Sequence, residues 1–242
     1  MLGLGNNLAR GGVLSGLTNT YSLEFDGTDD FVQLGNVMNL GSTTDFTISC
    51  WCKSTEWTNE AIMEKREDVN NRWLLQTDAA DKLIFYSKGG GTTGVYYTGT
   101  NALTTYENSW VHIAIVSDRS INTKGYINGV LDNTRVEADP DLDLDNTGDF
   151  MIGKTVSDGY EFGGNIDEVA IWDTALSAGS ISNIYNNGVP TDLLADSNSA
   201  NLQGWWRMGD GDTFPTITDN STNSNDGTMT NMASDDIVKD TP

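Results

Sequence analysis

DFTISCWCK, residues 45–53, is the stretch that decides the fold, because its side chains change character at every second position. The side chains that share its apolar face are Phe46, Ile48, Cys50 and Cys52. The opposite face carries Thr47, Ser49, Trp51 and Lys53. A period of two predicts a β-strand with one face buried and the other open.

Similar short apolar runs recur along the chain and predict further strands. They cover 21–26, 30–35, 61–65, 72–77, 82–87, 94–99, 110–118, 150–154 and 165–173. Asn128-Gly129 lies between two apolar runs and predicts a tight hairpin, since both residues tolerate a positive φ. A helical pattern is visible at 174–188. Many short strands with one short helix indicate an all-β fold, a two-sheet antiparallel sandwich.

The chain of 242 residues has 13 Lys and Arg against 35 Asp and Glu, a net charge of −22. This length fits one large all-β domain or two small ones. The charge argues against nucleic acid and anionic membranes as partners, because no basic patch is available to displace counterions. The surplus carboxylates suit a hard cation such as Ca²⁺.

The N-terminal sequence MLGLGNNLARGG has neither the basic region nor the apolar core of a standard signal peptide. We therefore expect a protein acting outside a cell to leave by another route, such as lysis. Residues 1–20, rich in Gly and Asn, predict a flexible attachment arm. Cys50 and Cys52 share one strand face at ~6.5–7 Å, at or beyond the usual Cα separation of a disulfide, so we expect reduced core thiols.

Five segments, in order, resemble the laminin G/pentraxin-like group of concanavalin A-type jelly-roll domains. They are SLEFDGTDDFVQLG, DFTISCWCKS, NSWVHIAIVSD, YINGVLDN and GGNIDEVAIWDTALSAGSISNIYNNG, within 21–188. The resemblance implies two curved antiparallel sheets packed face to face as a jelly-roll sandwich. The same fold serves lectins, enzymes, adhesion modules and virion proteins, so it does not assign a function by itself.

The C-terminal stretch 202–232 resembles the element with which family members often begin, an arrangement similar to a circular permutation. We favour a closing strand region within one jelly-roll domain, 21–232, followed by a tail at 233–242. The alternative is a strand exchanged with a neighbouring subunit. Trp205 and Trp206 are adjacent, so one of them must face out of its sheet or into an interface.

The amino-acid sequence of this C-terminal stretch resembles that of structural proteins of marine tailed bacteriophages. The resemblance implies a non-enzymatic virion structural protein, a capsid decoration, fibre or appendage subunit. Such a protein is assembled in the bacterial host cytoplasm and displayed on the virion surface. We expect a homo-oligomer that joins other virion proteins through residues 1–20. The alternative is a carbohydrate-binding adhesion module for host or matrix attachment, and the two roles are compatible.

An enzyme is the third hypothesis, and the sequence argues against it. Related glycan hydrolases carry an E-x-D-x-E or E-x-D-x-x-E strand that puts two carboxylates on one face. Here Asp167 and Glu168 are adjacent, so they face opposite sides of a strand. Asp141, Asp143 and Asp145 share a face but are followed by turn residues. His112 has no evident nucleophile partner and fits a packed, hydrogen-bonded histidine.

The resemblance also implies a structural Ca²⁺ near the first and last strands. The matching residues are Asp26, Asp30 and Asp167, and Asp219 could join them. Oxygen ligands on flexible loops suit Ca²⁺ better than Zn²⁺. The alternative is that these aspartates are ordinary turn and loop-capping residues.

Glycan binding needs exposed rings for stacking and polar groups that fix hydroxyls. Trp51 lies on the polar face of its strand, so we expect it to contact the sugar. The domain should then lose its affinity for sugar on Trp51→Ala. Arg72, Tyr86 and Tyr97 occupy positions that could line the same sheet, and Trp57 follows in a loop. The alternative is that these large aromatic side chains belong to the core or lie under a loop or subunit.

Overall fold

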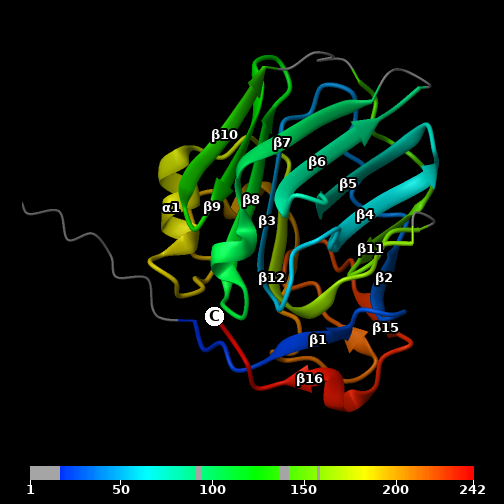
Figure 1. Ribbon diagram of the computed structural model, residues 1–242, viewed down its shortest axis with the longest axis vertical. Helices are drawn as coiled ribbons and strands as arrows, with labels where there is room; N and C mark the ends of the chain where they lie inside the picture. The colour runs from blue at the N-terminus through cyan, green and yellow to red at the C-terminus, as the bar shows by residue number, and fades with distance from the viewer. Residues whose placement is uncertain (1–16, 91–93, 137–141, 157–158) are drawn as a thin grey trace, which may run out of the picture.

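The structure is a computed structural model, and it describes residues 17–90, 94–136, 142–156 and 159–242. Two antiparallel sheets of eight strands each pack face to face, as Figure 1 shows. This arrangement confirms the predicted jelly-roll sandwich. The layers form because each sheet has an apolar face that only another layer can bury.

One sheet, sheet A, contains the strand predicted at 45–53, which is β3, and the strands that pair with it on both sides. Its order is β10 (Val130–Val136), β9 (Asn122–Ile127), β8 (Val111–Asp118), β3 (Phe46–Ser54), β12 (Gly163–Trp172), β1 (Ser22–Asp26) and β16 (Ile237–Val238). β13 (Leu202–Trp206) also pairs with β12, beyond the end of β1. The change of partner falls at an irregularity at 167–170, where Glu168 has a φ of 48°.

The other sheet, sheet B, is a single path of strands. Its order is β14 (Thr216–Ile217), β15 (Gly227–Thr230), β2 (Phe31–Gly35), β11 (Asp149–Ile152), β4 (Ala61–Asp68), β5 (Asn71–Thr77), β6 (Lys82–Lys88) and β7 (Val95–Ala102). In this sheet β5 pairs with β6, and β6 pairs with β7. They lie side by side on the face turned to the viewer in Figure 1.

The core lies between the sheets. The apolar face of β3 is fully buried there, and the Phe46 ring lies 5.6 Å from that of Phe85 in sheet B. Cys50 and Cys52 are free thiols with their sulfur atoms 3.6 Å apart. The alternating apolar positions of 45–53 therefore point as predicted.

The predicted turn and helix are both present. Asn128 and Gly129 have φ values of 50° and 73° and join β9 to β10 as a tight hairpin. Helix α1 (Ala178–Tyr185) begins where the Ser177 side chain accepts a hydrogen bond from the Ser180 amide. In the part of the chain that the structure describes, short 3-10 helices occur at η1 (Leu103–Tyr106), η2 (Ser199–Asn201) and η3 (Ser234–Asp236). Across the described residues, every helix is too short or too polar to pass through a membrane.

The stretch 202–232 contributes to both sheets of its own chain. β13 pairs with β12 in sheet A, and β15 pairs with β2 in sheet B. Trp206 is fully buried between the sheets, 5.8 Å from the ring of Phe150, while Trp205 lies on the other side of sheet A. Strand alternation thus sends the two adjacent rings into two different cores.

The segment 233–242 is not a free tail. Its β16 extends sheet A by pairing with β1. The Asp240 carboxylate accepts hydrogen bonds from Lys53 Nζ at 2.6 Å and from Trp110 Nε1 at 2.9 Å. The sequence did not indicate this, because a two-residue strand carries no periodicity.

The predicted attachment arm falls mostly on residues 1–16, which lie outside the described residues. Residues 17–20 lie against the domain. Asn19 Nδ2 donates to Asp167 at 2.7 Å, and the Thr20 amide donates to Asp210 at 2.8 Å. Arg207 donates to the carbonyl of Thr18 at 2.7 Å. The last residues of the predicted arm are therefore bound to the domain.

Candidate functional site

An open cluster of tyrosines and one arginine lies on the outer face of sheet B. Tyr86 on β6 is directly opposite Tyr96 on β7, and their ring centres are 4.3 Å apart. The Arg72 guanidinium, from β5, lies 4.9 Å from the centre of the Tyr86 ring. Neighbouring strands at matched register bring these three side chains to one face.

The cluster borders a hollow of about 580 Å³. Its lining residues are Arg72, Leu74, Gln76, Ile84, Tyr86, Tyr96 and Tyr160. Leu74, Ile84 and Tyr86 are buried and form a small apolar base. Tyr96 is 56% exposed at its rim. We call Arg72, Tyr86, Tyr96 and Tyr160 the tyrosine platform.

A buried carboxylate fixes the arginine of the tyrosine platform. Glu64 on β4 is fully buried, and its Oε1 lies 3.2 Å from Arg72 Nη1 and 3.7 Å from Arg66 Nη1. Its Oε2 accepts the Val156 amide at 2.6 Å. Burial is the main cause that raises the pKa of Tyr86, so its hydroxyl is protonated at neutral pH and can donate. The platform therefore offers ring faces, hydroxyls and a positioned guanidinium.

Trp51 lies far from the tyrosine platform, which corrects the prediction that it lines the same sheet as Arg72 and Tyr86. It is on β3 of sheet A and only 3% exposed. Its ring stacks on Tyr185 of α1 at 5.7 Å and lies 5.1 Å from His112. The predicted open face of 45–53 is thus wrong, because α1 covers it.

Tyr97 also lies elsewhere. It is 1% exposed and points into the core, where its hydroxyl donates to Asp132 at 3.1 Å. Successive residues of a strand face opposite sides, so Tyr96 and not Tyr97 joins Tyr86. The alternation was visible in the sequence, but the sequence did not show which residues of β7 share a face with Tyr86 of β6. Trp57 is fully buried as well.

His112 and Ser49 form a buried pair, with Nε2 and Oγ 2.7 Å apart. Burial lowers the pKa of His112 to about 3, so the ring is neutral. The cavity beside Ser49, Trp51 and Glu168 is about 10 Å³. Room for one water at most gives this pair no access to a substrate, which fits the predicted packed histidine.

Of the predicted calcium ligands, Asp26 and Asp30 lie together, but Asp167 does not join them. Asp26 pairs with Gly163 in the β1–β12 ladder, so Asp167, four residues further along β12, lies ~13 Å away. Asp167 instead accepts the Asn19 side chain. Burial raises its pKa well above the usual range. Asp219 accepts the amides of Trp205, Ser221 and Asn225.

Asp29 replaces Asp167 in the acidic group that does form. Carboxylate oxygens of Asp26, Asp29 and Asp30 lie within 4.8 Å of one another in the loop between β1 and β2. Asp26 Oδ1 accepts the Thr28 amide at 2.7 Å, and Asp30 Oδ2 accepts the Asp26 amide at 3.0 Å. These bonds are those of an ordinary turn. A calcium ion at this loop remains a prediction.

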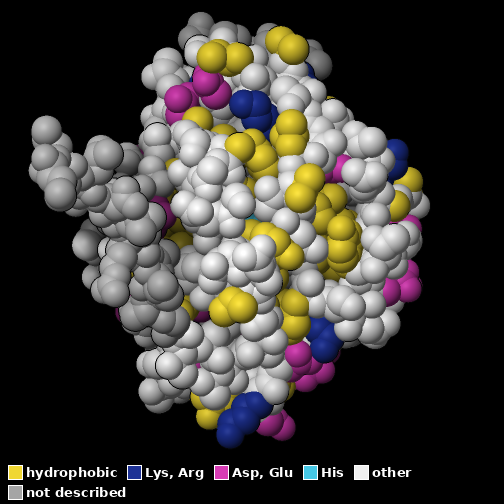
Figure 2. All heavy atoms as spheres, turned by 90° about the vertical axis from the view of Figure 1, so that its left-hand side faces the viewer, with side chains coloured by type: hydrophobic (Ala, Val, Ile, Leu, Met, Phe, Trp, Pro, Cys, Tyr) yellow, Lys and Arg dark blue, Asp and Glu magenta, His cyan; other side chains and the backbone are white. Residues whose placement is uncertain are grey.

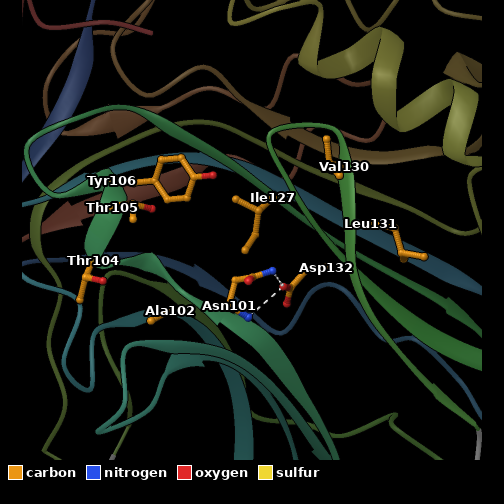
Figure 3. A pocket seen from close by; sticks show the side chains of 9 residues that line it. All are labelled: Asn101, Ala102, Thr104, Thr105, Tyr106, Ile127, Val130, Leu131 and Asp132. Atoms are coloured by element: carbon orange, nitrogen blue, oxygen red, sulfur yellow. Dashed lines mark hydrogen bonds between the residues drawn. The ribbon is translucent and has the colours of Figure 1, made fainter.

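A second hollow, of about 420 Å³, lies between η1 and the β9–β10 hairpin. Figure 3 shows Asn101 and Asp132 joined by hydrogen bonds, with Tyr106 and Ile127 also lining the hollow. Both oxygens of Asp132 are occupied, since Tyr97 and the Thr100 amide bond the other one. This carboxylate therefore fastens β10 to β7 and is not available to a ligand.

The β-sandwich and its open sheet face define a lectin-like domain. Residues 26–182 match the Laminin_G_3 family model, whose description is "Concanavalin A-like lectin/glucanases superfamily". The chain belongs to this family.

The chain is similar to botulinum neurotoxin type E of Clostridium botulinum, with 25% identity over 165 residues. That alignment covers 63% of this chain and 13% of the toxin. The chain thus spans a small part of the toxin's length.

Solved structures share the fold. A "putative carbohydrate binding protein" from Bacteroides ovatus has a TM-score of 0.66 and 19% identity, over 93% of this chain and 60% of that one. Domain 4 of AbnA, a GH43 extracellular arabinanase from Geobacillus stearothermophilus in complex with arabinotriose, has a TM-score of 0.53 and 22% identity, over 71% and 82%. The pentraxin of Limulus polyphemus has a TM-score of 0.54 and 14% identity, over 69% and 82%.

Proposed function

We propose that this chain is a non-enzymatic carbohydrate-binding domain and that the tyrosine platform is its glycan site. The observation that carries the proposal is the Tyr86–Tyr96 pair on sheet B, in which Arg72 lies over the buried Tyr86 ring and the Tyr96 ring is exposed. Sugar rings stack their C–H faces on aromatic rings, and adjacent polar groups fix the hydroxyls. The matching arabinanase domain in complex with arabinotriose and the Bacteroides ovatus protein are further support.

The same site argues for binding over hydrolysis. Glycoside hydrolysis needs two carboxyl groups at the scissile bond. The lining of the tyrosine platform contains no Asp or Glu among the described residues. Glu64 lies beneath it, fully buried and held by Arg72, so it is a positioning residue for that guanidinium.

The test is binding of the purified domain to immobilised bacterial surface polysaccharides and to a glycan array. Tyr96→Ala removes an exposed ring without opening the core, so we expect a folded protein that loses at least about tenfold in affinity. Tyr106→Ala removes a half-buried ring beside the hollow at η1, outside the tyrosine platform, and is the control that should bind normally once its fold is verified. Unchanged binding by Tyr96→Ala, or loss only with Tyr106→Ala, would place the glycan elsewhere.

We further propose that the domain is displayed on the virion of a tailed phage, joined to other virion proteins through residues 1–20. The support from the structure is the anchoring of residues 18–20 by Asp167, Arg207 and Asp210, which gives any such attachment a fixed connection to the domain. Deleting residues 1–16 should leave a folded, glycan-binding domain that is absent from purified particles. Incorporation of the shortened protein at the normal level would contradict this role.

A further inference from the structure

A third hollow, of about 500 Å³, is separate from the tyrosine platform and differs from it in chemistry. Its lining residues are Asn36, Val37, Met38, Asn39, Leu40, Thr44, Asp173, Gln203, Asn223 and Asn225. They come from the loop after β2, the end of β12, the strand β13 and the loop before β15. We call it the amide hollow. Its volume lies within the ~300–1,000 Å³ range of ligand pockets.

Backbone carbonyls of β13 orient two of the amides. Asn223 Nδ2 and Asn225 Nδ2 both donate to the carbonyl of Gln203, at 3.0 and 3.1 Å. Donation by the nitrogen leaves the amide oxygen of each side chain as its remaining group. Within the described part of the chain, these two oxygens accept no hydrogen bond.

The opposite wall is fixed in a similar way. Lys65 Nζ and Asn39 Nδ2 donate to Asn36 Oδ1 at 2.8 and 3.2 Å, so the Asn36 amide nitrogen is the group left to donate. Asp173 Oδ1 accepts Asn201 Nδ2 at 2.9 Å, while its second oxygen is without a partner among the described residues. The amide hollow therefore offers several oriented acceptors and a donor.

We propose that the amide hollow is a second saccharide site, which binds one neutral sugar residue through its hydroxyl groups. Hydroxyls donate and accept, so they match carbonyl acceptors beside an amide donor. The buried Met38 and Leu40 supply an apolar base for the ring. This site needs nothing from the tyrosine platform, and the two would make one domain bivalent.

Charge separates this ligand class from the alternatives. Asp173 is the one charged side chain of the lining, so an acidic sugar or phosphate would meet no cation there. A single carboxylate is also too little charge for a tight calcium site. A neutral polyhydroxyl ligand has neither requirement.

The experiment is NMR titration of the ¹⁵N-labelled full chain with glucose, galactose, mannose and N-acetylglucosamine, each at millimolar concentration. We expect at least one sugar to shift the side-chain amide signals of Asn36, Asn223 and Asn225. Thr44→Trp fills the hollow at an exposed position and should weaken this binding about tenfold or more. Thr43→Trp, the adjacent exposed position outside the lining, is the matched control and should bind normally.

Two further samples keep the outcome decisive. The Gln203 side chain donates through Nε2 to the Asn201 carbonyl at 3.3 Å, which leaves its Oε1 as an acceptor. If Thr44→Trp does not fold, Gln203→Met removes this side-chain oxygen at nearly constant shape and should give the weaker affinity. Tyr96→Ala should leave these shifts intact, so failure of the platform and failure of the amide hollow are distinguishable. No shift with any of the four sugars, equal shifts in Thr44→Trp, or the same shifts with calcium chloride alone would overturn the proposal.

Discussion

The two outer faces of the sandwich carry similar aromatic side chains, but other segments of the chain cover one face and leave the other largely uncovered. On sheet A, helix α1 and the chain around Leu193 cover the strands. Ile181 of the helix forms a second core there with Trp172 and Trp205 of the sheet. On sheet B, the outer cluster is limited to Leu74, Ile84 and Tyr86, and Tyr96 remains exposed beside it. Figure 2 looks onto the side of α1 and shows apolar side chains gathered near the middle with acidic ones scattered around them.

The difference teaches that an aromatic ring on a polar strand face is not by itself a binding residue. Trp51 and Tyr86 both alternate with core positions, yet one lies under a helix and the other beside a hollow. What decides between them is whether a segment distant in sequence returns over that face. A helix that returns buries the ring, and an uncovered face leaves it for a ligand.

The largest test of this comparison is Trp51→Ala against Tyr96→Ala. Removing a buried Trp leaves a cavity and costs about 3–5 kcal/mol of unfolding free energy. Losing the exposed Tyr96 ring should cost less than about 0.5 kcal/mol. Chemical unfolding gives the stabilities, and glycan binding should be retained by Trp51→Ala wherever it is folded. A stable Trp51→Ala protein that no longer binds sugar would contradict this comparison, because it would place the sugar site on sheet A and not on sheet B.

The second test concerns the loop between β1 and β2, which connects the two sheets. If Ca²⁺ binds Asp26, Asp29 and Asp30, it stabilises the native state by about 2.7 kcal/mol at a hundredfold excess over Kd. The melting temperature should then fall in a chelator for the wild type but not for Asp29→Asn. Asp68→Asn, in another aspartate turn, is the control that should keep the calcium response. Equal melting curves with and without calcium, starting from metal-free protein, would contradict calcium binding at this loop.

The third test concerns Glu168, a buried acid of β12 in sheet A. Burial raises the pKa of Glu168 to about 7, although Arg207 Nε lies 3.1 Å from it and Trp205 Nε1 donates to it at 2.6 Å. Asp167 and Asp210 are the other acids near it, and Arg207 is the cation. Between pH 5 and 7 the folded protein holds a proton that the unfolded chain releases, so stability falls as pH rises.

One such group contributes up to about 1.4 kcal/mol per pH unit to that slope. Glu60, whose pKa burial also raises to about 7, adds to it in the wild type. Urea unfolding at pH 5, 6 and 7 should show a shallower slope for Glu168→Gln than for the wild type. Glu24→Gln, on an exposed position of β1, should leave the slope as it is. Parallel slopes for all three proteins would mean that Glu168 is ionised throughout.

Part of the candidate site was predictable from the sequence. The sequence predicts that Arg72 and Tyr86 line one sheet, and the structure brings them together. Tyr97 was predicted beside them, but its neighbour Tyr96 takes that place. Alternation defines the two faces of a strand but not which of them points inward. Asp167 was placed with Asp26 by resemblance, and the β1–β12 register separates them. The amides of the amide hollow gave no signal, since isolated Asn residues are typical of any loop.

The sequence by itself determined the sandwich, because alternation of apolar residues, turn residues such as Asn128-Gly129 and a capped short helix are local properties. The tertiary structure alone decided which faces are covered. Helix α1 over Trp51, β16 against β1, and Asn223 with Asn225 against β13 all depend on contacts between distant segments. Such contacts depend on the packing of whole layers, which no local pattern encodes, and they separate a core tryptophan from a tyrosine that can bind a sugar.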